Sequence, residues 1–145
     1  RGAQLYTLVK SFVEAQKRYY LINGEYSTKF DNFDITLEGA TKPSATSFGH
    51  SVSSTDAVRR FDNFEITLNI NSTAFNGVIG TNISGKYKSS GIAYYFLGNS
   101  GLPLNQLHCF ENTGTFTQPA GSYCQEIMGF KTLKTTAYSA RYYVQ

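Results

Sequence analysis

The sequence predicts an α+β fold, in which one long N-terminal helix packs on an antiparallel sheet of about four strands, followed by a C-terminal disulfide-bounded loop. Three observations predict it. Apolar residues recur at helical spacing over residues 1–22. Later apolar segments are short and are separated by turns rich in Gly, Asn and Ser. The chain has only two cysteines, Cys109 and Cys124, and both lie in its last third.

The helix is expected over residues 1–22. Its apolar arc covers roughly half of the circumference, which is wider than the ~100° stripe that one core requires, so we expect two packing partners. Asn23-Gly24 predicts the end of the helix, whereas residues 1–4 offer no capping residue, which indicates that the chain begins inside a longer helix. The face expected to serve packing and assembly consists of Leu5, Leu8, Val9, Phe12, Val13, Tyr19 and Tyr20.

Residues 23–63 are expected to connect the helix to the sheet. Within them, residues 38–58 are small and polar, which predicts a long surface excursion. The segment 29–37 recurs almost unchanged at 60–68. Two copies are too few for a repeat architecture, so this likeness indicates a local reuse of phenylalanine anchors.

Antiparallel strands are expected within residues 64–111. Residues 64–70 alternate between apolar side chains and Glu65, Thr67 and Asn69, a pattern typical of a half-buried strand. Three further strands are expected at 78–83, 92–97 and 104–110, the first of them weakened by Gly77 and Gly80.

Residues 109–145 are expected to form the disulfide region and a last strand at 138–144. Cys109 and Cys124 match neither a CxxC motif nor a metal-binding pattern. One disulfide in an oxidising compartment is the favoured interpretation, and closing a loop of about 15 residues would contribute ~3 kcal/mol. Two reduced thiols in a cytosolic protein are the alternative. Ser122-x-x-Gln125 predicts a capped helix of one to two turns that ends at Gly129.

The sequence predicts no enzyme, no catalytic, cofactor-binding or metal-ligating residue, and no cofactor. His50 and His108 lack partners at metal-ligand spacing, and no nucleophile, phosphate-binding or zinc motif occurs. The acids that could pair are expected to be solvent-facing; they are Asp31, Asp34, Asp62 and Glu65.

Nucleic acid is a candidate partner because basic residues alternate with tyrosines at 17–20, 86–88 and 141–143. The net charge of +3 is small, and Tyr19 and Tyr20 are assigned to the helix core, so the sequence favours other partners.

The helix exit resembles that of bacterial type IV pilins. Residues 12–27 contain EAQ-x-x-YY-x-x-NG-x-Y, and an acidic and apolar segment follows at 30–35. Cys109 and Cys124 are similar to the pair that bounds the C-terminal region of that family, and residues 125–129 resemble the turn after its second cysteine.

The resemblance implies one pilin-like domain over 1–145 that assembles through its N-terminal helix into an extracellular filament of a Gram-negative bacterium. Its implied partners are other pilin subunits, as a homopolymer or with minor pilins, and the inner membrane through a segment preceding Arg1. Before assembly the globular domain would be periplasmic, and adhesion, motility or DNA uptake would be its role.

Two alternatives remain. One is a pseudopilin of type II secretion, a class that typically stabilises its C-terminal loop with calcium. Residues 98–145 contain only two acids, Glu111 and Glu126, which argues against an oxygen-ligand calcium site. The other alternative is a non-catalytic extracellular binding module.

Overall fold

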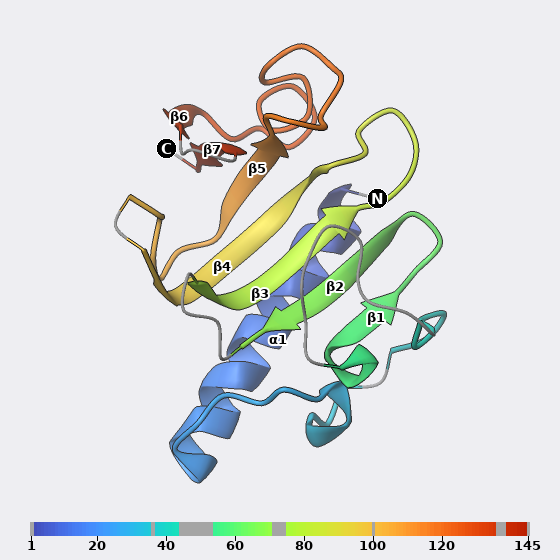
Figure 1. The fold of residues 1–145 in the computed structure, drawn as a ribbon, viewed down its shortest axis with the longest axis vertical. Coiled ribbons are helices and arrows are strands. Elements are labelled where there is room, and N and C mark those ends of the chain that lie inside the picture. The colour runs from blue at the N-terminus through green and yellow to red at the C-terminus, as the bar shows by residue number, and fades with distance from the viewer. Residues whose placement is uncertain are drawn as a thin grey trace.

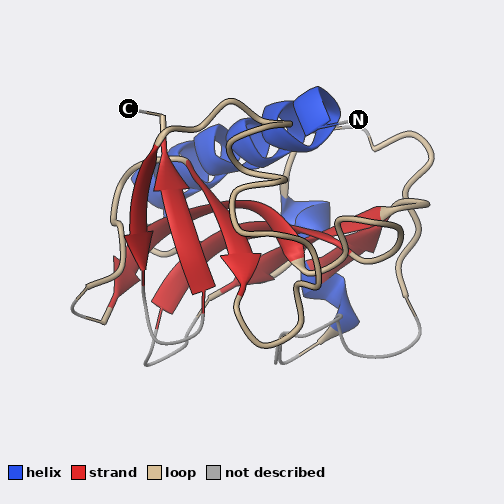
Figure 2. Ribbon diagram, turned by 90° about the horizontal axis from the view of Figure 1, so that it is seen from above, coloured by secondary structure: helices blue, strands red, loops and turns tan. Residues whose placement is uncertain are grey.

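The computed structural model describes residues 2–35, 37–43, 54–70, 75–99, 101–135 and 139–144. Helix α1 (Gly2–Asn23) lies across one face of an antiparallel sheet (Figures 1 and 2). Two 3-10 turns, η1 (Phe30–Asn32) and η2 (Thr55–Ala57), lie in the connection to the sheet. The strands of the described residues are β1 (Val58–Arg60), β2 (Phe64–Asn69), β3 (Phe75–Asn82), β4 (Ser90–Gly98), β5 (His108–Asn112), β6 (Thr132–Thr135) and β7 (Ser139–Tyr143).

The predicted fold class, a helix on about four strands, was wrong. The described residues form a mostly β structure with a seven-stranded sheet in the order β1-β2-β3-β4-β5-β7-β6. Two strands escaped prediction because β1 and β6 are short and carry Arg, Lys and Thr in place of an apolar alternation. Their positions depend on pairing with β2 and β7, which local sequence does not reveal.

Two predicted elements also have different bounds or types. The strand expected at 104–110 is β5 at His108–Asn112, and Leu104 makes only an isolated bridge to Tyr95. The helix expected over 122–129 is a series of hydrogen-bonded turns in which amide nitrogens bond to carbonyls four and five residues earlier. The Ser122 hydroxyl makes no hydrogen bond to any described residue, so the predicted capping box does not form there.

The close contact between α1 and the sheet depends on Gly80 of β3. A Cβ at this position would lie 2.5 Å from Leu5 Cδ1 and 2.7 Å from Val9 Cγ2. The glycine expected to weaken this strand therefore provides the space that the helix occupies. At its other end α1 stops at Asn23, where Gly24 has a φ of +73° and its N–H donates to the Tyr20 carbonyl, as the Asn-Gly pair predicts.

The second face of the sheet is also buried over much of its area. Ile79, Ala93, Tyr95 and Phe110 form an apolar cluster separate from the core under α1. The strand predicted at 64–70 is present as β2, but all six of its residues are buried, so the prediction that it is half-buried was wrong. Glu65 in particular is fully buried and ion-paired with Arg60, whose Nη2 lies 2.9 Å from Glu65 Oε1.

Candidate functional site

The exit of α1 is held by a buried glutamine. The Gln16 side chain donates from Nε2 to the Ser27 carbonyl at 2.9 Å and accepts from the Ser27 N–H at 2.8 Å. The Ser27 hydroxyl in turn accepts from Asn32 Nδ2 at 2.9 Å and donates to the Lys29 carbonyl. The segment that resembles the pilin helix exit is thus connected to η1 by hydrogen bonds in addition to apolar contacts.

The predicted helix face divides by burial. Four of its residues are almost fully buried under the sheet, and they are Leu5, Val9, Phe12 and Val13. Leu8 and Tyr19 are half-buried. Tyr20 is 45% exposed, and its ring lies 4.6 Å from that of Tyr26 with the two planes tilted by 33°.

The wide apolar arc is covered from within the chain. Phe12 contacts Phe30 edge-on at 4.9 Å, and Tyr19 contacts Phe33 at 6.2 Å. Tyr6, on the other flank, packs 6.2 Å from Phe130. The sheet and these flanking segments supply the two partners that the arc predicted, so its width does not require a second subunit.

The last turn of α1 carries an exposed apolar pair. Leu21 is 85% exposed and Ile22 is 83% exposed, the highest values for large apolar residues in the described part of the chain. Lys17 and Arg18 lie one turn earlier and are also exposed. This helix end is therefore a projecting apolar surface beside positive charge.

The disulfide between Cys109 and Cys124 is present and both cysteines are fully buried. It joins β5 to the disulfide turn, residues 121–129. Glu111, two residues after Cys109, is buried and its carboxylate accepts three backbone N–H bonds from this turn. They come from Gly121 at 2.8 Å, Tyr123 at 3.1 Å and Cys124 at 2.9 Å. Sequence reasoning missed this role, since the bonded amides lie ten to thirteen residues away.

His108 and Arg141 form a buried polar pair on β5 and β7. Arg141 Nη1 donates to His108 Nε2 at 2.8 Å, and the guanidinium lies over the Tyr95 and Phe110 rings. Burial, followed by the nearby Arg141 charge, lowers the pKa of His108 to about 3. The imidazole is therefore neutral at ordinary pH, and Arg141 is not placed to contact a nucleic-acid phosphate.

The other candidates remain apart from one another. Asp31 has a largely exposed side chain that pairs with Arg59 at 3.0 Å, and Asp34 and Asp62 are exposed. His50 lies outside the described residues. Within the described ranges no three His, Cys, Asp or Glu side chains come together as metal ligands. No helix there combines the length and apolarity that spanning a membrane requires.

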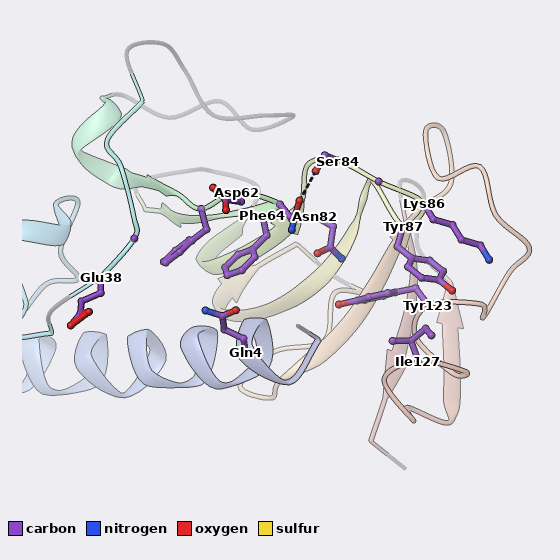
Figure 3. Close-up of a pocket in the computed structure, with 14 residues that line it drawn as sticks. Gln4, Glu38, Asp62, Phe64, Asn82, Ser84, Lys86, Tyr87, Tyr123 and Ile127 are labelled. Carbon is purple, nitrogen blue, oxygen red and sulfur yellow. Dashed lines mark hydrogen bonds between the residues drawn. The ribbon is translucent and has the colours of Figure 1, made fainter.

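A groove of about 610 Å³ lies beside the first turns of α1, where the loops after β1 and β3 approach the disulfide turn (Figure 3). Gln4, Asn82 and Tyr123 are among the residues that line it. Sequence reasoning did not identify this groove, because its residues come from distant segments and share no motif.

Comparisons with protein-family models, curated proteins and solved structures found no match to this chain.

Proposed function

We propose that this protein is a structural subunit of a bacterial type IV pilus and that it contacts neighbouring subunits through the end of α1. The proposal begins from the likeness of residues 12–27 to the pilin helix exit. We choose the end of α1 as the contact surface because Leu21 and Ile22, near the end of that segment, are exposed. Two adjacent aliphatic side chains in water are unfavourable unless another surface covers them.

Two features support an extracellular structural role. The disulfide and the Glu111 carboxylate both attach the disulfide turn to β5. A disulfide favours an oxidising compartment such as the periplasm or the cell surface. Because both Glu111 oxygens already accept backbone N–H bonds, the disulfide-type subunit is favoured over a calcium-stabilised pseudopilin.

The test is a Leu21→Asp, Ile22→Asp double variant in the native gene, with filaments sheared from the cells and counted by electron microscopy. We expect loss of filaments containing this subunit, with unchanged cellular subunit level and an intact disulfide. Leu133→Asp is the matched control, because Leu133 is 51% exposed on β6, away from the end of α1. Undiminished filaments in the double variant, or wild-type filaments that lack this chain, would contradict the proposal.

A further inference from the structure

The groove beside Gln4 has two aromatic walls. Phe61 and Phe64 stack at 4.6 Å with their planes 19° apart, and Tyr87 and Tyr123 lie 5.6 Å apart on the opposite wall (Figure 3). Phe61 and Tyr87 are only half-buried. Each wall therefore keeps part of an aromatic ring accessible from the groove.

The two loops that carry these walls are joined to each other. The Ile83 N–H donates to the Asn63 carbonyl at 2.9 Å, and the Ser84 hydroxyl donates to Asn63 Oδ1 at 3.2 Å. Within the loop after β1, the Phe61 N–H donates to the Phe64 carbonyl at 2.8 Å and closes the turn at residues 61–64. These bonds preorganise the groove, so a ligand would not have to order it.

Hydrogen-bonding groups lie in and beside this space. The Tyr123 hydroxyl is buried and not open to the groove; it points between the Asn82 and Gln4 side chains (Figure 3), has no partner of full hydrogen-bond geometry in the described residues, and is close enough to Asn82 to interact with it. Burial raises the pKa of Tyr123, with the Asn82 side chain opposing that shift, so the hydroxyl is a neutral donor. The Nδ2 group of Asn63 also has no partner among the described residues, and Gln4 presents an exposed carboxamide.

The charges of the groove narrow the ligand class. Among the described residues that line the groove there are two acids, Glu38 and Asp62, and one cation, Lys86, whose Nζ lies 5.5 Å from the Tyr87 ring centre. This balance disfavours phosphates and other anions. A wholly apolar ligand would leave the exposed carboxamides of Gln4 and Asn63 without water or partners, which is costly. An uncharged molecule with apolar faces and many hydroxyl groups satisfies both requirements.

We propose that this groove binds an uncharged saccharide, with the C–H face of a sugar ring against Phe61 or Tyr87 and its hydroxyls bonded to the exposed carboxamides of Asn63 and Gln4. Hydroxyls both donate and accept, which matches the two carboxamides of this site. The volume lies within the ~300–1,000 Å³ of small-molecule sites. This binding is independent of the proposed filament role.

The test is an amide NMR titration of the full chain with a panel of neutral sugars: the methyl glycosides of glucose, galactose, mannose and N-acetylglucosamine, plus lactose and cellobiose. Tetramethylammonium and inorganic phosphate are the charged comparison probes. We expect at least one sugar to give saturable shifts in residues 61–64, 82–87 and 123. Phe61→Leu, which keeps apolar bulk but removes the ring, and Asn63→Leu should each weaken binding about tenfold.

Phe33→Leu is the matched control, because Phe33 is also a half-buried phenylalanine in a connecting segment, packed on Phe12 away from the groove. It should leave sugar affinity unchanged. The proposal is overturned if no sugar of the panel shifts the groove amides. It is also overturned if only tetramethylammonium or phosphate shifts them, or if Phe33→Leu weakens binding as much as Phe61→Leu does.

Discussion

The carboxamide of Gln16 and the backbone of Ser27 form a two-point hydrogen bond across the helix exit. The Ser27 N–H donates to Gln16 Oε1 at 2.8 Å, and the Ser27 carbonyl accepts from Gln16 Nε2 at 2.9 Å. The Gln16 side chain is fully buried. Water therefore has no access to replace these bonds if the side chain is lost. Within the motif that resembles the pilin helix exit, this glutamine has a structural role that its spacing alone does not reveal.

Gln16→Met should destabilise the protein, because it keeps the length of the side chain and removes both hydrogen bonds. Each buried backbone group left unsatisfied costs about 1–3 kcal/mol, so with two such groups we expect a total loss of about 2–6 kcal/mol in urea unfolding. Lys10→Met on the exposed side of α1 is the control and should stay within about 0.5 kcal/mol of wild type. Equal unfolding midpoints for the two variants would rule out this role of Gln16.

Glu111→Gln should loosen the disulfide turn without breaking the disulfide. The amide side chain has one acceptor oxygen, so at least one of the three turn N–H groups loses its partner, at about 1–3 kcal/mol. Hydrogen exchange should accelerate at Gly121, Tyr123 and Cys124. Glu126→Gln, an exposed acid in the same turn, should leave these rates unchanged. Unaltered exchange in the Glu111 variant would show that the carboxylate does not hold the turn.

The sequence correctly predicted those elements that are determined by the pattern of neighbouring residues. The periodicity of residues 1–22, the Asn23-Gly24 stop and the apolar run at 92–97 correspond to α1, its end and the middle of β4. The sheet was underestimated because its edge strands are defined by pairing partners and carry few apolar residues.

Buried polar residues were the other source of error. Glu65 was expected to face solvent and Glu111 was assigned no structural role, yet both are buried: Glu65 pairs with Arg60 five residues earlier, and Glu111 accepts from amides ten to thirteen residues later. An acid within a predicted strand could have indicated burial with a partner, although not which partner. The groove likewise depends on segments that only the tertiary structure brings together.

His108 should make stability depend on pH below neutrality. Its pKa is about 3 in the folded protein against an ordinary value of 6.5, so between these values the unfolded chain binds more protons. The contribution of neutral His108 to the free energy of unfolding is complete above pH 6.5, the pKa of the unfolded state. It is lost as pH falls below that value, with a slope approaching ~1.4 kcal/mol per pH unit. His108→Gln, which keeps an acceptor for Arg141, should remove this slope between about pH 6.5 and pH 4.5. His50 is present in both wild type and His108→Gln, so its titration cancels in the comparison. If the unfolding free energies of the two proteins had the same pH dependence, His108 would not be the group responsible.

Gly91 and Gly80 should respond differently to alanine, although both lie in the centre of the sheet. A Cβ on Gly91 would collide with the backbone carbonyl of Gly80, which cannot move without separating β3 from β4. A Cβ on Gly80 would instead meet the ends of the Leu5 and Val9 side chains, which can rotate or shift with α1. We expect Gly91→Ala to cost about 3 kcal/mol or more, and Gly80→Ala about 1–2 kcal/mol.

Gly114→Ala serves as the control for both variants, because a Cβ there would meet only Asn112 Oδ1, at the ordinary contact distance of 3.6 Å. Urea unfolding of the three variants should therefore give the order Gly91, Gly80, Gly114 from most to least destabilised. If Gly80→Ala proved as damaging as Gly91→Ala, the helix would be held against the sheet more rigidly than side-chain contacts alone provide. If Gly91→Ala were neutral, the close approach of β3 and β4 at this position would be wrong.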